Sequence, residues 1–202
     1  MAQGFDASCV ETSEAARTAA RARFAAAGRD VPLVTDLAEL DGPFDLIIAC
    51  EVLEHIEDDL AALRSWAARL PQGGLVLLTV PAHPDRFGPS DVWAGHFRRY
   101  RRSDLECLAR EAGLFVNRLL CFGFPLGNLL EPVRSRVYTL RLRREGSIPL
   151  AQRTARSGIE RGIEAKLAPL CRPWLLLPFC WIQMPFFHTD LGTSYLLVAV
   201  RS

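Results

Sequence analysis

The sequence predicts an α/β fold whose sheet is mostly parallel, with an antiparallel last strand. Short apolar segments alternate with helix-length amphipathic segments through the first 120 residues. This alternation is typical of a parallel sheet covered by helices on both faces. A strand expected at 114–122 is followed by a long inserted segment, residues 125–188, and then by a closing strand at 194–200. Such an order favours an antiparallel pair at one side of the sheet.

Length and composition limit the class of protein. The chain has 202 residues, enough for one domain with a full core, and a net charge of +1. A charge this close to zero gives no reason to expect a nucleic-acid partner. The 6 cysteines are scattered without a C-x-x-C pair, and residues 1–6 lack the pattern of a signal peptide. We therefore expect a cytoplasmic protein.

The first part of the chain contains three expected strands. Alternating apolar and polar residues predict the first strand, Thr12 or Ser13 can cap the helix that follows, and Gly28 suits its end. The continuous apolar run at 46–50 is typical of a strand buried on both faces. The expected elements are a strand at 4–10, a helix from 13 to 27, a strand at 31–34, a loop at 37–43 and a strand at 46–50.

The second part continues the alternation. Apolar residues recur at helical spacing between 57 and 70, and a Pro-Gln-Gly-Gly turn separates this helix from another apolar run. Ser103 and Glu106 have the spacing of a capping box, and Gly113 can end the helix that follows. The expected elements are a helix at 57–70, strands at 75–80 and 114–122, a helix from 103 to 112 and a last strand at 194–200.

The inserted segment divides the chain into two parts. The core comprises residues 1–124 and 189–202, and residues 125–188 form a helical insertion or lid. Its first part predicts an amphipathic helix that is rich in arginine, and the apolar run at 173–187 is too short and too interrupted by proline to span a bilayer. One interpretation is a lid whose apolar faces pack together. The other is peripheral contact of 125–188 with a membrane, because cationic segments with Trp and Phe bind such surfaces.

The strand at 46–50 ends in side chains that carry chemistry. Glu51 comes directly after this apolar run, and Glu54 and His55 follow shortly after it. Ligands of open parallel sheets bind outside the carboxyl ends of the strands. This sequence of residues therefore indicates a candidate functional site.

Three segments resemble the class I S-adenosylmethionine-dependent methyltransferases. Residues 4–13 (GFDASCVETS) are similar to the second strand of that family with its acidic end. Residues 44–56 (FDLIIACEVLEHI) are similar to its fourth strand, and 70–81 (LPQGGLVLLTVP) to its fifth. The segment 95–105 (GHFRRYRRSDL) resembles a branch with a long insertion before the last strand. The resemblance implies a Rossmann-like methyltransferase sheet and S-adenosyl-L-methionine as cofactor.

The glycine-rich loop of that family, together with its first strand, has no counterpart in this sequence. That loop brings backbone amides close to the ligand. The resemblance therefore implies an N-terminally truncated fold, in which the sheet lacks a central strand and the cofactor lacks one wall.

The resemblance also assigns cofactor-binding positions. Glu11 corresponds to the acid that accepts the ribose hydroxyls, and Asp36 with the Leu37 backbone corresponds to the adenine position. The alternatives are a helix-capping carboxylate for Glu11 and an ordinary loop residue for Asp36. The positions next to the methionine end of the cofactor are Ala49, Cys50 and Glu51.

The residues after the third strand suggest a metal site as well. Glu51, Glu54 and His55 fall on one face if the chain forms a helical turn, and oxygen-rich ligation suits Mg²⁺ or Mn²⁺. The string E-x-x-E-H resembles metal-assisted O-methyltransferases, in some of which a later histidine takes part, here His96 or His83. The alternative is that these residues only orient a loop beside the cofactor.

His96 and His83 are the histidines placed to act as a catalytic base, because both follow the strand at 75–80. Each could instead be a structural residue. Arg98, Arg99 and Tyr100 could grip an anionic substrate or fold the lid, and the alternative is a solvated basic patch.

Together these features predict a methyltransferase that acts on an O, N or C nucleophile of a small-molecule or lipid-linked acceptor. The alternative is a non-catalytic, truncated methyltransferase-like protein that serves as a binding or regulatory partner. A nucleotide-binding oxidoreductase is disfavoured, because hydride transfer has no evident use for the E-x-L-E-H strand end.

Overall fold

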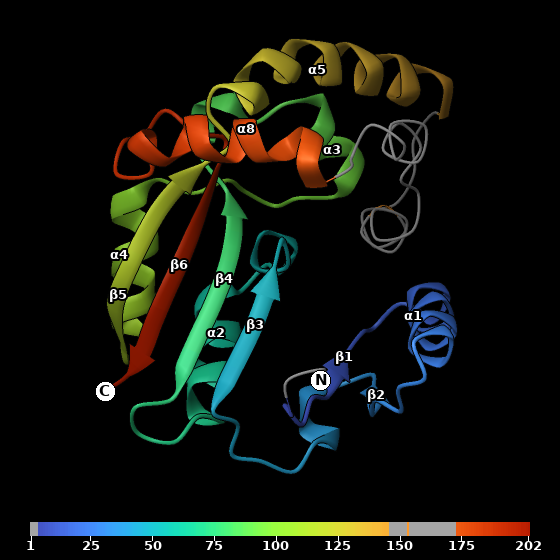
Figure 1. Ribbon diagram of the computed structural model, residues 1–202, viewed down its shortest axis with the longest axis vertical. Helices are drawn as coiled ribbons and strands as arrows, with labels where there is room; N and C mark the ends of the chain where they lie inside the picture. Colours follow the sequence, from blue (N-terminus) through green and yellow to red (C-terminus); the bar gives the residue numbers. More distant parts are fainter. Residues whose placement is uncertain (1–3, 146–152, 154–172) are drawn as a thin grey trace.

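A four-stranded mixed sheet forms the centre of the molecule (Figure 1). The computed structural model describes residues 4–145, 153 and 173–202. The strands lie in the order β3-β4-β6-β5, with β3 parallel to β4 and β6 antiparallel to both of its neighbours. Their bounds are β3 Leu46–Cys50, β4 Leu75–Pro81, β5 Leu114–Phe122 and β6 Ser194–Arg201. The antiparallel last strand is thus confirmed, and it lies between β4 and β5.

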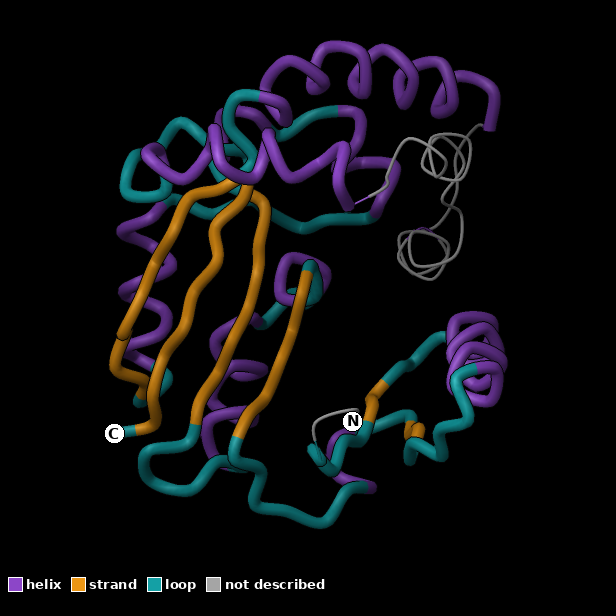
Figure 2. The backbone as a smooth tube through the Cα atoms, in the orientation of Figure 1, coloured by secondary structure: helices purple, strands orange, loops and turns teal. Residues whose placement is uncertain are grey.

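The core lies on one face of this sheet. Helices α2 (Asp59–Ala68) and α4 (Arg102–Glu111) cover that face (Figures 1 and 2). Alternate residues of the strands point toward them, as the two-residue period of a strand requires. Val76, Leu78 and Leu197 are fully buried there, packed in one cluster with residues of both helices.

The expected second layer of helices is wrong for the described part of the chain. On the face opposite α2 and α4, the sheet carries apolar side chains that remain in contact with solvent. Ile48 is 61% exposed and Phe115 is 67% exposed. In the described residues, β3 also has no partner on its outer side.

The N-terminal unit stands beside the sheet rather than extending it. β1 (Cys9–Val10) and β2 (Leu33–Val34) pair in parallel as a separate two-stranded sheet, joined by α1 (Glu14–Ala26). Ser13 caps α1 as predicted, because its Oγ accepts a hydrogen bond from the Ala16 amide. The predicted strands at 4–10 and 31–34 are too long, since only two residues of each have a pairing partner.

A third group of elements lies beyond the carboxyl ends of β3 and β4 (Figure 1). It includes α3 (Pro89–Ala94), which begins at a proline and was not predicted. The predicted insertion contains α5 (Leu126–Glu145), α8 (Pro173–Gln183) and the short turn η5 (Met184–Phe186). Residues 146–152 and 154–172 of this insertion lie outside the described residues. None of the described helices combines the length and the hydropathy needed to cross a membrane.

One predicted helix start is wrong. Helix α4 begins at Arg102 instead of after a Ser103 cap, and Arg101 at its N-cap makes no side-chain capping bond. Ser103 Oγ donates to Asp104, while Arg102 reaches Asp190 and the Leu119 carbonyl. Because these long-range bonds hold the first turn of α4, the predicted capping box at Ser103 does not set where the helix begins.

We expect the two faces of the sheet to respond differently to truncation. Replacing Leu78, which is fully buried, with Ala should lower the free energy of unfolding by ~2–5 kcal/mol. Replacing the exposed Ile48 with Ala should change it by less than ~1 kcal/mol. Urea denaturation of both variants measures the difference. Equal losses would mean that the outer face is covered in solution.

Candidate functional site

The site begins where β3 ends. Glu51 follows the strand in the left-handed region, with φ 53°, and its amide donates to the Thr79 carbonyl of β4. This reversal leads into a single turn, η2 (Leu53–His55), whose first residue is fully buried. Because Leu53 anchors the turn in the core, Glu54 is drawn inward and is 0% exposed.

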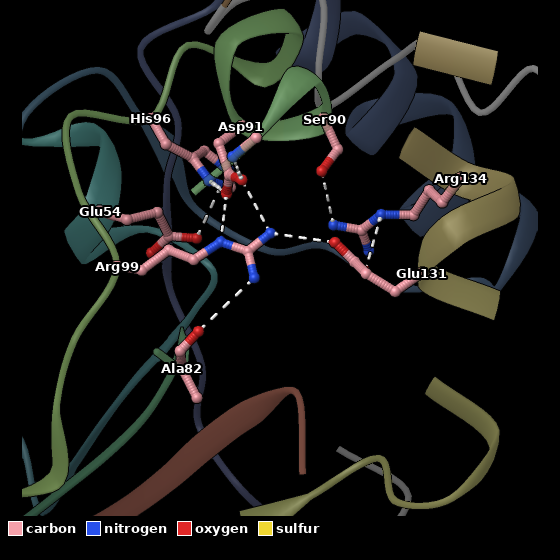
Figure 3. Close-up of polar contacts among 9 residues, drawn as sticks. Glu54, Ala82, Ser90, Asp91, His96, Arg99, Glu131 and Arg134 are labelled. Carbon is pink, nitrogen blue, oxygen red and sulfur yellow. Dashed lines mark hydrogen bonds and ion pairs between the residues drawn. The ribbon is translucent and has the colours of Figure 1, made fainter. Parts of the chain in front are cut away.

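The segment after β4 brings a second set of side chains to the same place. Ala82 bridges Tyr100 in parallel, so the chain between them forms a long loop that contains α3. The Phe97 amide donates to the Glu54 carbonyl at 2.8 Å and holds the end of this loop against η2. His96 is thereby placed beside Glu54 (Figure 3).

Glu54, His55 and His96 form one cluster. His96 Nε2 lies 3.9 Å from Glu54 Oε1, and the His55 and His96 rings meet edge to face with centroids 4.7 Å apart. A ligand atom from each of the three side chains lies within 4.8 Å of the other two. Glu51, which the sequence analysis predicts as a metal ligand with Glu54 and His55, is outside this group, and His96 is in it instead.

The cluster contains buried polar atoms that have no hydrogen-bond partner among the described residues. Both carboxylate oxygens of Glu54 and Nδ1 of His55 are in this state. Burial raises the pKa of Glu54 to about 9, with a further contribution from the nearby charge of Glu51. Burial, helped by His96, lowers the pKa of His55 to about 4. At neutral pH the carboxyl of Glu54 is therefore protonated and the imidazole of His55 is neutral.

Asp91 orients His96 and was missed by the sequence analysis. Its Oδ1 lies 2.9 Å from His96 Nδ1, and both of its oxygens accept hydrogen bonds from Arg99 at 2.8 and 2.7 Å (Figure 3). Although burial raises the pKa of Asp91, the bonds from His96, Arg99 and the Gly88 amide hold it well below its usual value. Asp91 is thus ionised. No local sequence pattern indicates its role beside His96.

The basic residues after His96 are structural. Arg99 is 5% exposed and is bound to Asp91, so the expectation that it grips an anionic substrate is not supported. Arg98 pairs with Asp59 at 2.9 Å, and the Tyr100 hydroxyl donates to the same carboxylate at 2.9 Å. These contacts agree with the alternative that the segment folds the lid region.

His83 lies apart from the cluster. It adopts φ 65°, and its Nε2 lies 3.0 Å from the Gly192 carbonyl at the start of β6. Its ring also contacts Tyr195, with centroids 5.8 Å apart. These contacts favour a structural role, and a catalytic role for His83 stays a prediction.

The predicted ribose and adenine residues belong to the N-terminal unit. Glu11 Oε1 accepts a hydrogen bond from the Ser13 amide at 2.8 Å, and Asp36 Oδ1 accepts one from the Ala38 amide at 2.7 Å, just after Leu37. Glu11 thus accepts a backbone hydrogen bond just before α1, and Asp36 caps the short turn Leu37–Glu39. The structure does not join their strands to the sheet that carries Glu51. Cofactor binding by these residues stays a prediction.

The positions expected near the methionine end are on β3. Ala49 pairs with Leu78 and Cys50 with Thr79, so both lie at the carboxyl end of the strand beside β4. Ala49 is buried, whereas Cys50 and Glu51 are exposed. Their contact with a cofactor is untested, although their location at the strand end agrees with it.

Comparison with known proteins identifies the class. Residues 1–118 match the model of the family described as methyltransferase domain. No curated protein matches the chain in sequence. Because the family model covers more than half of the sequence, the chain belongs to the methyltransferase domain family. It is a class I S-adenosylmethionine-dependent methyltransferase.

Solved structures of methyltransferases share the fold of this chain. A candidate sarcosine dimethylglycine methyltransferase from Galdieria sulphuraria aligns with a TM-score of 0.57 and 14% identity, covering 96% of this chain and 69% of its own. An S-adenosylmethionine-dependent methyltransferase from Mesorhizobium loti aligns with a TM-score of 0.53 and 18% identity, covering 99% and 83%.

A third structure is a phosphoethanolamine N-methyltransferase from Haemonchus contortus, in complex with S-adenosyl-L-methionine. It aligns with a TM-score of 0.53 and 16% identity, covering 95% of this chain and 42% of its own. At these identities the three structures establish the shared fold, and their acceptors are not transferred to this chain.

The buried carboxyl of Glu54 should make stability depend on pH. Its pKa of about 9 in the folded state exceeds the ordinary value of 4.5, so the folded protein keeps a proton that the unfolded chain releases. This contribution is complete below pH ~4.5 and declines as the pH rises toward ~9. Glu54→Gln cannot lose a proton and should remove the decline.

Urea denaturation between pH 5 and pH 9, with a chelator present, measures this effect. Glu57→Gln is the matched control, because Glu57 is exposed and lies only three positions away. A Glu54→Gln profile identical to that of the unmodified protein would contradict the buried, protonated state.

Proposed function

We propose that this methyltransferase transfers a methyl group from S-adenosyl-L-methionine to an O, N or C nucleophile of a small or lipid-linked acceptor, with His96 as the base. The observation that carries the proposal is the Asp91–His96 pair at the carboxyl ends of β3 and β4. Ligands of open α/β sheets bind at this end of the strands. This location of the imidazole supports a role in the transfer to the acceptor.

The hydrogen bond to Asp91 decides which nitrogen of His96 can act. With Asp91 ionised, His96 Nδ1 carries the proton and donates it, so the lone pair is on Nε2. Nε2 can then accept the proton that an O–H or N–H acceptor loses as its oxygen or nitrogen bonds to the methyl carbon. The electron pair of the broken carbon–sulfur bond stays on sulfur and neutralises the sulfonium.

The surrounding chain restricts access of water to this imidazole. The side chain of His96 is 11% exposed, and Glu54 and Asp91 on either side of it are 0% exposed. In-line displacement depends mainly on orientation and on exclusion of water. The buried neighbours of His96 supply both.

Replacing His96 with Gln should lower kcat by a factor of about 10²–10⁴, the usual contribution of a general base. His188→Gln is the control, because His188 is exposed and lies outside the site. Isothermal titration calorimetry with S-adenosyl-L-methionine and S-adenosylhomocysteine should give the same affinity for both variants and the unmodified protein. Absence of any cofactor binding would instead favour the non-catalytic binding partner.

A divalent cation in the cluster is a second candidate, favoured by the orphaned carboxylate oxygens of Glu54. Glu54, His55 and His96 would hold the ion, and Asp91 would orient His96 as second-shell carboxylates orient ligating histidines. The ion would supply positive charge beside the acceptor. Two imidazoles with one carboxylate suit Mn²⁺ better than Mg²⁺, which prefers oxygen ligands.

The two candidates give His96 different roles, because Nε2 cannot ligate an ion and accept a proton together. Calorimetric titration with Mn²⁺ and with Mg²⁺ separates them without an activity assay. We expect Mn²⁺ to bind and Glu54→Gln to weaken its binding at least ten-fold, while Glu57→Gln leaves it unchanged. Absence of Mn²⁺ binding would exclude the metal and leave His96 as the base.

A further inference from the structure

Helix α5 is attached to the rest of the protein through one of its faces. Glu131 accepts a hydrogen bond from Arg99 at 3.3 Å (Figure 3), and Tyr138 lies against Trp93 of α3 with ring centroids 4.9 Å apart. Arg134 donates to the Ser90 hydroxyl at 3.2 Å. These residues recur at spacings of three, four and seven, so they belong to one side of the helix.

The opposite face of α5 is apolar and exposed. Leu129, Val133 and Leu140 are 71%, 59% and 54% exposed. Spacings of four and seven residues place them on one stripe, turned away from the residues that contact α3. An apolar stripe that faces away from the core contributes nothing to folding of the described structure, so it requires another explanation.

A second exposed apolar segment lies close to the start of α5. The Gly123 amide donates to Gln183 at the end of α8, which connects the two helices at the same end of the sheet (Figure 1). Mean hydropathy is high along α8, and Trp181 is 71% exposed. The other exposed apolar residues of α8 and η5 are Leu177, Phe179, Ile182 and Met184.

Among the described side chains of α5, those that are both charged and exposed are all arginine. Arg136, Arg143 and Arg144 are exposed on α5. Glu131 is the acidic residue of α5 whose side chain is described. It already forms ion pairs with Arg99 and Arg134. Apolar residues with a tryptophan and a fringe of arginine are the pattern of a segment that lies in the interface of a bilayer.

We propose that the exposed faces of α5, α8 and η5 form one surface, the α5–α8 surface, that binds anionic phospholipid bilayers. Arginine side chains gain favourable interaction with anionic headgroups, while Trp181 and the leucines enter the boundary of the acyl region. A second copy of the chain is a poorer occupant, because two such surfaces would bring arginine against arginine. The absence of a membrane-crossing helix among the described residues agrees with a surface that lies on the bilayer.

The location of this surface has a consequence for the acceptor. Helices α5 and α8 lie beyond the carboxyl ends of β3 and β4 (Figure 1). The His96 cluster is formed at the end of β3, by η2 and the loop that follows β4. A bound bilayer would therefore adjoin the site, and the acceptor would be lipid-linked. This consequence rests on the proposed function, whereas binding to the bilayer does not.

Co-sedimentation with vesicles of phosphatidylcholine alone, and of phosphatidylcholine with phosphatidylserine, tests the surface. The protein should pellet with the anionic vesicles and release as salt is raised. Arg136→Gln and Arg143→Gln should each weaken partitioning about five-fold. Trp181→Ser should weaken it as well, and Arg118→Gln and Phe115→Ser, at exposed positions of β5, should leave it unchanged.

Several outcomes would overturn the proposal. These are absence of pelleting with either vesicle, partitioning that survives all three surface variants, and a dimer that Trp181→Ser dissociates. Calorimetry with S-adenosyl-L-methionine on the same samples keeps the two proposals separate. Vesicle binding without cofactor binding would leave the lipid surface standing and remove the methyltransferase function.

Discussion

The buried pair of Asp91 and Arg99 holds together the parts of the protein that concern function. Both groups are almost fully removed from water, so each depends on the other for its charge to be tolerated. Asp91 also orients His96, and Arg99 also binds Glu131 of α5. One ion pair thus connects the loop after β4, the candidate base and the inserted helix. Loss of Arg99 would remove the cation that pairs with the buried Asp91, and loss of Asp91 would leave Glu131 as the acid that pairs with Arg99.

Glu54 shows how the fold changes the chemistry of a motif. The motif E-x-L-E-H contains two carboxylates that look equivalent in the sequence, but the turn after β3 places them in opposite environments. Glu51 stays in solvent, whereas Glu54 is enclosed and keeps its proton at neutral pH. A buried carboxyl without hydrogen bonds is costly unless a ligand or ion compensates for it. This unsatisfied group makes the cluster a candidate site, rather than a loop support alone.

Much of the fold could be predicted because its signals are local. The apolar runs of β3 and β4, the Ser13 cap and the stretch of β5 each depend on neighbouring residues, and the structure has them where expected. The capping box at Ser103 failed because Arg102 makes bonds to residues far along the chain. The grouping of Glu11 and Asp36 with Glu51 required one continuous sheet. The structure has two separate sheets instead.

The sequence by itself determined the class of protein, the order of most elements and the location of reactive groups after β3, because these follow from periodicity and short motifs. Only the tertiary structure decided that His96 joins Glu54 and His55, that Asp91 holds His96, and that the leucines of α5 face outward. The physical reason is that burial and pairing depend on contacts between distant segments. A side chain's partners and its proton are set by those contacts, which adjacent residues do not encode.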